Sequence, residues 1–392
     1  MPTASPALVA AADDGLAWLR DVAWPFWLEH GIDRGEDGNP IGFREFLSLD
    51  NLCCVADYRR LRVLTRQTFV FSEALATGMK EAETAVDLGL YYLRTHAFDG
   101  AGGYHWRFDL QGGIMDPKRD LYDHAFVLLA LATATRARPD PLLRAEALAL
   151  DTYLHTVFPH PAGGYGESLP PSLPRRQNPH MHLLEACLAA DEAFDDSPFL
   201  ARAAGIVDLF LSRMFQSAEG ALPEYFDDGL VPHREDGRFA VEPGHHAEWI
   251  WLLDLFARRR QAAGKPVGDA VADAIRHLGA FVDRFGIHAE TGGLVDVLWS
   301  DGAVASAGQR LWPQAERLKA EILRPDAEEA RILKAFAVLE DYIAPAPAGL
   351  WMEQRAADGS FSPARASAPA SSLYHLTSAY MVAARSLGSE QL

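Results

Sequence analysis

Three histidines are the residues of this sequence best suited to chemistry. His182 and His245 are each followed three residues later by a glutamate, Glu185 and Glu248, and His375 stands near the C-terminal end. Residues three apart are neighbours on one face of a helix. A carboxylate beside an imidazole fixes its tautomer and raises its basicity, which suits the ring to moving protons near neutral pH. The pairs therefore predict general acid–base catalysis.

The histidines belong to a longer series of polar or aromatic residues that recurs along the chain. Its members, separated by 58, 58, 63, 67 and 63 residues, are Arg66, His124, His182, His245, Trp312 and His375. If each residue lies near the start of an inner helix of a ring, the spacing directs one side chain per repeat toward a common axis. Convergent polar groups in a concave, aromatic-lined site are typical of small-molecule binding.

A repeat in the glycines defines the elements that must position these side chains. Glycines followed by an apolar or aromatic residue, at intervals of 60, 61, 57, 72 and 57 residues, begin at Gly42, Gly102, Gly163, Gly220, Gly292 and Gly349. The segments between them, such as 122–137 and 245–260, carry apolar residues at the three- and four-residue steps of helices. Sixty residues hold two helices and their loops.

Six such units could form an open solenoid or a closed ring. An open solenoid needs polar terminal caps, and the terminal repeats here are no more polar than the others. We therefore expect an all-α fold, an (α/α)6 toroid of six helical hairpins that forms one domain over residues 1–392.

The composition excludes several classes of partner. The net charge of −18 argues against nucleic acid and anionic membranes, and no stretch of about 18 apolar residues is present to span a bilayer. Cys53, Cys54 and Cys187 show no zinc-type spacing and fit a reducing compartment. We expect a cytoplasmic monomer or homodimer that acts on a small molecule.

Motifs of rival chemistries are absent from the sequence. His180 with His182, or His245 with Glu248, could supply metal ligands, but HExxH and closed Cys/His sets do not occur. Neither GxSxG nor the glycine-rich nucleotide motifs are present. We expect no metal and no cofactor.

Six segments in order resemble motifs of the acylglucosamine 2-epimerase superfamily, which includes cellobiose 2-epimerases and the mannose and sulfoquinovose aldose–ketose isomerases. They are Arg62–Ser72 (RVLTRQTFVFS), Lys118–Phe126 (KRDLYDHAF), Asn178–Ala186 (NPHMHLLEA), Pro243–Trp249 (PGHHAEW), Leu311–Ala320 (LWPQAERLKA) and Tyr374-His375. The resemblance covers nearly the whole chain and also implies an (α/α)6 barrel without a metal or redox cofactor. Its first and third segments are most similar to the mannose isomerase group.

The resemblance implies a role for each matching residue. Sugar oxygens would be bound by Arg66 and Asn178, and the reacting end of the sugar by His182. Glu185, the helical neighbour of His182, would also bind the substrate. Tyr122 and Trp312 would line the pocket. The catalytic residues would be His245, with Glu248 as its partner, and His375.

These residues predict an aldose–ketose isomerase that interconverts D-mannose, or a close relative, and D-fructose through a cis-enediolate. A sugar 2-epimerase is the alternative within the same chemistry. A glycoside hydrolase or lyase, or a sugar-binding protein, is the alternative outside it. Arg175 with Arg176, or Arg234 with Arg238, are candidates for binding an anionic substituent at C6.

Overall fold

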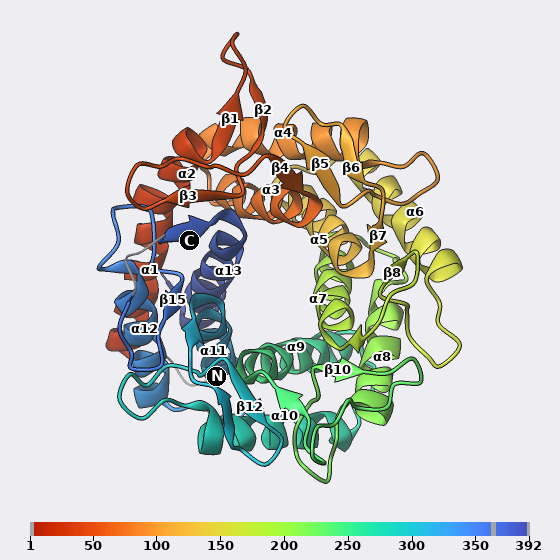
Figure 1. Ribbon diagram of the computed structural model, residues 1–392, viewed down its shortest axis with the longest axis vertical. Helices are drawn as coiled ribbons and strands as arrows, with labels where there is room; N and C mark the ends of the chain where they lie inside the picture. The colour runs from red at the N-terminus through yellow and green to blue at the C-terminus, as the bar shows by residue number, and fades with distance from the viewer. Residues whose placement is uncertain (1–3, 362–365, 390–392) are drawn as a thin grey trace.

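The computed structural model describes residues 4–361 and 366–389, and their helices form two concentric rings (Figure 1). The inner helices are α3 (Leu61–Ala76), α5 (Leu121–Ala137), α7 (Asn178–Ala193), α9 (Pro243–Ala262), α11 (Leu311–Leu323) and α13 (Ala370–Leu387). The outer helices are α1 (Pro6–Trp18), which continues through a π-helical turn into α2 (Trp24–His30), then α4 (Glu83–Tyr92), α6 (Pro141–Val157), α8 (Phe199–Leu209), α10 (Asp269–Phe281) and α12 (Glu329–Ile343). The predicted (α/α)6 barrel is confirmed.

The ring closes through the two ends of the chain. Each inner helix packs against the next, and α13 packs against α3. Five hairpins join helices that are consecutive in sequence, whereas the sixth is formed by α13 and α1. The inner helices are buried on nearly every face, as expected for helices covered by an outer ring on one side and by each other elsewhere.

Glycine punctuates the connections from outer to inner helices. Gly102, Gly163, Gly220 and Gly292 follow outer helices in this way and have φ between +64° and +111°, a region that favours residues without a Cβ. Gly349 does the same after α12, with φ +81°. Gly42 also lies between an outer helix, α2, and an inner helix, α3, but it belongs to β2 and pairs with Asp33.

Short strands join the loops that precede the inner helices. They are β1 (Ile32–Arg34), β2 (Pro40–Phe43), β3 (Phe46–Ser48), β4 (Tyr58–Arg60), β5 (Arg107–Asp109), β6 (Ile114–Asp116), β7 (Arg119–Asp120), β8 (Ser168–Leu169), β9 (Arg175–Arg176), β10 (Tyr225–Phe226), β11 (Ala240–Val241), β12 (Val297–Trp299), β13 (Val304–Ser306), β14 (Gln309–Arg310), β15 (Gln354–Arg355) and β16 (Ser367–Pro369). Antiparallel pairs such as β4–β5, β7–β8 and β11–β12 link each loop to the next, and β16 pairs with β3 to complete the circle. The β1–β2 hairpin projects from the ring (Figure 1).

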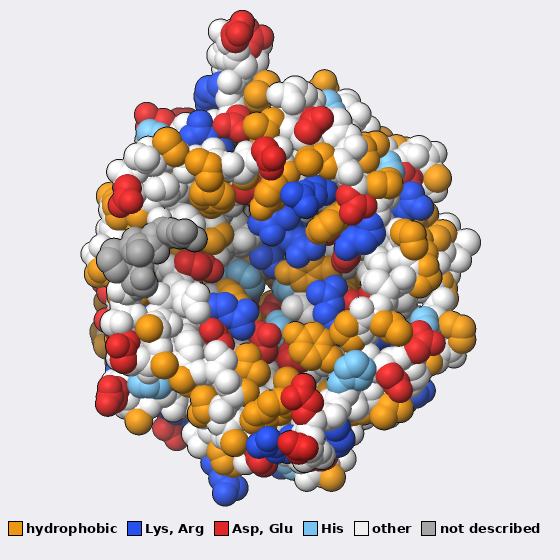
Figure 2. Space-filling view, in the orientation of Figure 1, with side chains coloured by type: hydrophobic (Ala, Val, Ile, Leu, Met, Phe, Trp, Pro, Cys, Tyr) orange, Lys and Arg blue, Asp and Glu red, His pale blue; other side chains and the backbone are white. Residues whose placement is uncertain are grey.

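This connectivity gives the barrel two different ends. The long, strand-bearing loops all precede inner helices, so the six inner helices begin at the same end, around a hollow visible in Figure 2. A helix N-terminus carries a partial positive charge and unpaired N–H groups. This end therefore favours negative charge near the axis. Among the described residues, no helix has the length and apolarity required to cross a membrane.

Candidate active site

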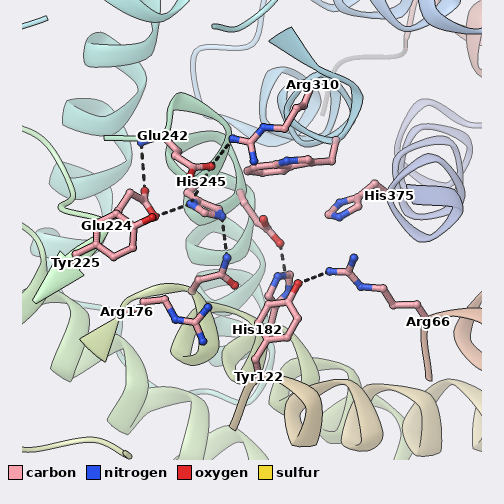
Figure 3. A pocket seen from close by; sticks show the side chains of 13 residues that line it. Arg66, Tyr122, Arg176, His182, Glu224, Tyr225, Glu242, His245, Arg310 and His375 are labelled. Carbon is pink, nitrogen blue, oxygen red and sulfur yellow. Dashed lines mark hydrogen bonds and ion pairs between the residues drawn. The ribbon is translucent and has the colours of Figure 1, made fainter. Parts of the chain in front are cut away.

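A cavity of about 270 Å³ lies at this end of the barrel (Figure 3). Its lining residues are Arg66, Tyr122, Arg176, Asn178, His182, Glu224, Tyr225, Glu242, His245, Glu248, Arg310, Trp312 and His375. Of the nine residues predicted for the site, eight line this cavity. The ninth, Glu185, lies one layer behind and contacts His182.

His375, on α13, is held as a neutral base. Its Nδ1 lies 2.7 Å from Oε1 of Glu316, and since a carboxylate only accepts, Nδ1 carries the proton. Burial lowers the pKa of His375 to about 3, and the nearby Arg66 adds to this effect against the hydrogen bond to Glu316. The Nε2 lone pair is therefore available to accept a proton.

Glu316 is itself fixed by two further partners. Lys319 lies 2.8 Å from its Oε2, and the indole N–H of Trp251 donates to the same oxygen at 2.8 Å. Although burial opposes its charge, Lys319 and His375 lower the pKa of Glu316 to about 2. An anchored carboxylate of this kind holds the His375 ring in one orientation.

His245, on α9, has the opposite electrostatic environment. Its Nδ1 lies 2.8 Å from Glu224 and 3.8 Å from Glu242. Burial works against the charged ring, but these two carboxylates raise the pKa of His245 above its usual value. The imidazolium form is favoured, and it can donate a proton.

The predicted partnership of His245 with Glu248 is wrong. The spacing i, i+3 is present, but Glu248 extends toward α7, where its Oε1 lies 3.4 Å from Nδ1 of His182. Within the described part of the chain, neither oxygen of Glu248 has a hydrogen-bond partner. Burial, and then the carboxylate of Glu316, raise the pKa of Glu248 well above its usual value. Glu248 is thus a neutral carboxylic acid that faces the cavity.

The predicted pair on α7 is present. His182 Nδ1 and Glu185 Oε2 are 3.0 Å apart, and Tyr374 donates its hydroxyl to the other oxygen of Glu185. Burial lowers the pKa of His182 to about 4 against the effect of Glu185. His182 therefore presents a neutral ring to the cavity.

Asn178 and Arg66 supply polar contacts on either side of His182. The Nδ2 of Asn178 lies 2.9 Å from Nε2 of His245, and rotating this amide by 180° would present its oxygen to a protonated ring. Among the described residues, the hydrogen-bond partners of Arg66 are the backbone oxygen of Ser371 and the hydroxyl of Tyr122, and neither is a carboxylate. Arg66 donates to the hydroxyl of Tyr122 at 2.6 Å and lies 4.3 Å from the centre of the Phe126 ring. Arg66 is therefore available to an anionic oxygen in the cavity.

The periodic series fails at His124, which does not line the cavity. Its Nδ1 bonds the backbone oxygen of Asp120 at 2.7 Å, and its Nε2 accepts the backbone N–H of Tyr104 at 3.0 Å. Tyr122, two residues earlier on α5, reaches the cavity instead. His124 therefore anchors a loop.

The same anchoring contact recurs around the barrel. As Tyr104 does after Gly102, the residue two positions after three further glycine markers donates its backbone N–H to an inner helix, in the pairs Tyr165–His180, Leu222–His246 and Leu294–Gln314. The distances are 3.0, 3.0 and 2.7 Å. These contacts explain why glycine markers and inner-helix polar residues share one period.

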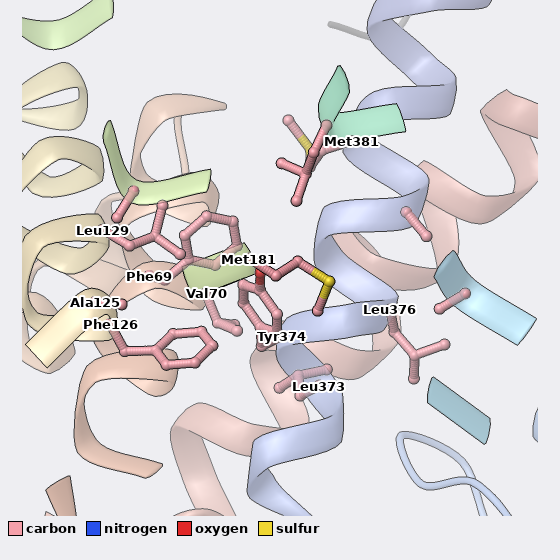
Figure 4. Close-up of a cluster of buried hydrophobic side chains, with 14 of the residues drawn as sticks. Phe69, Val70, Ala125, Phe126, Leu129, Met181, Leu373, Tyr374, Leu376 and Met381 are labelled. Atoms are coloured by element: carbon pink, nitrogen blue, oxygen red, sulfur yellow. The ribbon is translucent and has the colours of Figure 1, made fainter. Parts of the chain in front are cut away.

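An apolar layer lies behind the cavity. Phe69, Phe126, Met181 and Tyr374, from four inner helices, gather there (Figure 4). The ring of Phe126 lies 4.6 Å from that of His182. This layer excludes water, which explains the large effect of burial on the pKa values above.

The structure also separates the arginines proposed for an anionic substituent. Arg175 is buried and donates to the backbone oxygens of Gly163 and Tyr165. Arg234 and Arg238 do not line the cavity. Of the four, Arg176 alone does.

Four lining residues were missed from the sequence: Glu224, Tyr225, Glu242 and Arg310. All four lie in strand-bearing loops outside the periodic series, so the repeat carried no signal for them. Glu242 stands three residues before His245 and Glu248 three residues after it, so the sequence spacing could have indicated Glu242 as well. Glu224 and Arg310 had no comparable sequence signal.

Among residues 4–361 and 366–389, two groups of side chains have ligand atoms close enough to hold a metal ion. They are His182 with Glu185 and Glu248, and His245 with Glu224 and Glu242, each within 4.8 Å. Each histidine in these groups already has a carboxylate hydrogen-bond partner on Nδ1. The expectation that no metal is needed stays a prediction.

The sequence matches the family model for N-acylglucosamine 2-epimerase over residues 42–379, and the chain belongs to this family. It is 36% identical over 373 residues to a "Mannose-6-phosphate isomerase" of Rhizobium meliloti (strain 1021), covering 92% of this chain and 93% of that protein. It is 30% identical to a "D-mannose isomerase" of Thermobifida fusca over 279 residues, 66% of each chain.

Solved structures agree on the fold. A crystal structure of a D-mannose isomerase superposes with a TM-score of 0.82 at 22% identity, covering 97% of this chain and 98% of the other. Cellobiose 2-epimerase from Bacillus thermoamylovorans B4167 gives 0.81 at 19%, covering 95% and 98%. The protein is an isomerase, of the kind that isomerises or epimerises sugars.

Proposed function

We propose that the protein is an aldose–ketose isomerase that interconverts an aldose of mannose configuration and the corresponding ketose, D-mannose and D-fructose in the simplest case. The supporting observation is a pair of histidines that line the cavity, each with a carboxylate on Nδ1, and whose pKa values are shifted in opposite directions. The ring of Trp312 lies 4.8 Å from that of His245 and 5.8 Å from that of His375. An acid and a base so placed can act on neighbouring atoms of one sugar.

The reaction begins on the open-chain aldose. Neutral His375 takes the proton from C2, and the electrons of that C–H bond form the C1–C2 double bond. The electrons of the C1 carbonyl move to its oxygen, which receives a proton from His245. The product of this step is a cis-enediol, formed through an enediolate.

The second half-reaction returns the protons to different atoms. His245, now neutral, takes the proton of the C2 hydroxyl, and the C2 carbonyl forms. His375 delivers its proton to C1 on the face from which it took the first one. Both histidines end in their starting states, and aldose has become ketose.

Arg66, Glu248 and the inner-helix N-termini stabilise the enediolate. Arg66 and the neutral Glu248 face the cavity as hydrogen-bond donors, each worth about 3 kcal/mol in a site of this type. The helix N-termini add partial positive charge. An ionised Glu248 would repel the enediolate, so its raised pKa suits this role.

Two further points bear on the proposal. The relatives named for mannose or its phosphate share one sugar configuration. A hydrolase reading based on Glu185 and Glu248 loses support, because Glu185 does not line the cavity and cannot flank a sugar together with Glu248. Location in the cytoplasm and a monomeric or dimeric state stay predictions.

A 2-epimerase remains the second candidate because of the α7 side of the cavity. His182 and the neutral Glu248 lie 3.4 Å apart there and could supply a proton to C2 from a different direction than His375. Epimerisation needs this second group, whereas isomerisation does not.

Incubation with D-mannose, D-glucose and D-fructose in deuterated water, followed by NMR, distinguishes the two. The proposed isomerase makes fructose labelled at C1 from mannose, and mannose labelled at C2 from fructose. Interconversion of mannose and glucose without a ketose would overturn the proposal in favour of epimerisation. Absence of both conversion and label in every sugar would overturn both.

A further inference from the structure

One side of the cavity mouth is basic, although the chain carries a net charge of −18. Figure 2 shows Lys and Arg side chains gathered beside the central hollow, over the elements labelled β4 to β7 in Figure 1. We define the rim cluster as Arg62, Lys118 and Arg176. Their side chains are between one quarter and just over one third exposed.

Each member of the rim cluster is held from behind by a buried carboxylate. The ion pairs are Arg62–Asp123 at 3.0 Å, Lys118–Asp120 at 3.1 Å and Arg176–Glu167 at 2.8 Å. Arg62 and Arg176 use Nε in these contacts. Within the described residues, Nη1 of Arg62 and both terminal nitrogens of Arg176 have no hydrogen-bond partner. The arginines are thus oriented, with donors left over.

Shared neighbours bring the three cations together at the cavity. Lys118 lies 4.0 Å and Arg62 5.9 Å from the ring centre of Trp106, and Arg62 lies 4.8 Å from that of Tyr122, which lines the cavity. Burial opposes the charges of Arg62 and Arg176, but carboxylates that include Asp120 raise the pKa of both. Arg176 lines the cavity itself.

The opposite side of the mouth differs in its balance of charge. Arg310 also lines the cavity, but its Nε binds Asp296 and its Nη2 binds Glu242. Two acceptors therefore occupy Arg310, whereas each cation of the rim cluster has one. The balance of charge is therefore more positive beside the N-termini of α5 and α7 than beside Arg310.

We propose that the rim cluster binds a phosphate monoester at the far end of the sugar, so that the preferred substrate is a hexose 6-phosphate. This inference rests on the proposed isomerase function and names its substrate class. A phosphate monoester carries −1.5 to −2 charges near neutral pH and three acceptor oxygens, which match oriented arginine donors. His245 and His375 would then act on C1 and C2 at the other end.

A second neutral sugar ring fits this rim less well. Such a ring would stack on an exposed aromatic face, and Trp106 is the aromatic residue that Arg62 and Lys118 share. Lys118 and Arg62 already lie over its ring, so these cations compete with a sugar for the indole. A neutral ring would also leave the free guanidinium donors without charge compensation.

The test compares kcat/KM for mannose 6-phosphate and mannose in the wild type and in Lys118→Gln. We expect the wild type to prefer the phosphate ester at least tenfold, and the substitution to reduce that ratio severalfold. Added salt should reduce it in the wild type as well, since exposed charges are screened. Arg238→Gln is the matched control, because Arg238 also lies over a tryptophan, 4.9 Å from the Trp299 ring, and pairs with Asp301 outside the cavity. Its ratio should equal that of the wild type.

Binding of fructose 6-phosphate and fructose to His375→Asn, measured by calorimetry, separates the two proposals. If the wild type isomerises mannose but does not prefer its phosphate, or if Lys118→Gln keeps the full preference, the rim-cluster proposal is overturned and the isomerase stands. If neither sugar is isomerised, yet fructose 6-phosphate binds more tightly than fructose and Lys118→Gln removes the difference, the anion site stands and the proposed reaction fails.

Discussion

Two sets of histidines on the same inner helices behave differently. The axial histidines, His182, His245 and His375, line the cavity and each has a carboxylate on Nδ1. The anchoring histidines, His124, His180 and His246, each accept a loop N–H on Nε2. His180 and His246 stand two residues and one residue from axial partners, so the direction of a side chain from its helix decides its role.

The comparison teaches that burial alone does not mark a catalytic histidine. All six are buried, and burial lowers the pKa of the anchoring set to about 4, 3 and 4. What separates the sets is the partner. A carboxylate can compensate a proton gained on the ring, whereas a backbone N–H occupies the lone pair that would gain it.

The largest effect expected from this comparison is the loss of activity in His375→Asn. Asparagine can still donate to Glu316 but cannot take a proton from carbon, so kcat/KM should fall by about 10²- to 10⁴-fold. Deuterium exchange into substrate should fall equally, and the melting temperature should stay near that of the wild type. Retained exchange would show that another group is the base.

The next effect tests which carboxylate acts on His245: Glu224, its hydrogen-bond partner in the structure, or Glu248, the partner predicted from the sequence. Protonated His245 is the acid, so kcat/KM should fall as pH rises through its raised pKa. Glu224→Gln removes the largest charge that raises this pKa. The alkaline limb should therefore move to lower pH, and kcat/KM at pH 8 should fall about tenfold.

Glu248→Gln is the matched variant for that measurement. The Glu248 carboxyl is already neutral, so the amide changes no charge and both limbs of the pH profile should keep their positions. If the alkaline limb moved in Glu248→Gln and stayed in place in Glu224→Gln, Glu248 would be the partner of His245, as predicted from the sequence.

A smaller effect, on stability, is expected at the anchoring histidines. His124→Ala leaves the buried N–H of Tyr104 without a partner and should lower the free energy of unfolding by about 1–3 kcal/mol. His124→Gln should recover much of this loss, because Gln314 accepts the equivalent N–H of Leu294 at 2.7 Å. Denaturant unfolding measures both, and kcat of either folded variant should stay close to that of the wild type.

The pH dependence of unfolding gives a second check on His124. The pKa of His124 is about 4 in the folded protein and about 6.5 in an unfolded chain, so the unfolded state binds one more proton between these values. Stability is therefore lost as pH falls through this window, by about 1.4 kcal/mol per pH unit for one histidine. His124→Gln should show a shallower slope, and an equal slope would mean that His124 is charged in the fold.

The smallest effect expected is that of a chelator. In the proposed mechanism, the carboxylates beside the axial histidines orient the imidazole rings and set their pKa values, and they bind no metal. Dialysis against EDTA should therefore change kcat/KM by less than about twofold. A loss that zinc or manganese restores would assign one of the two His/Glu groups to a metal.

Much of the fold could be predicted because it repeats. Two helices per sixty residues, punctuated by glycine, predicted the barrel correctly, although Gly42 lies in a strand and the later markers have positive φ. The short strands between loops left no trace, since runs of two to four residues have no readable alternation. The rim and the orientation of the site depend on those loops.

The candidate site could be predicted where the helix itself carries the information. Helical spacing correctly paired His182 with Glu185. The same spacing failed for His245 and Glu248, because the carboxyl of Glu248 extends toward a neighbouring helix while Glu224 approaches from a loop. Sequence spacing predicts which side chains share one face of a helix. It does not predict which of several neighbouring carboxylates will form the hydrogen bond to a histidine.

The sequence by itself determined the ring of helical hairpins and the side chains that converge on its axis, since both follow from periodicity along one chain. Only the tertiary structure decided which histidine is charged and which is neutral. That choice depends on burial and on carboxylates from other helices and loops, and electrostatic energy is set by distance in space rather than by separation in sequence.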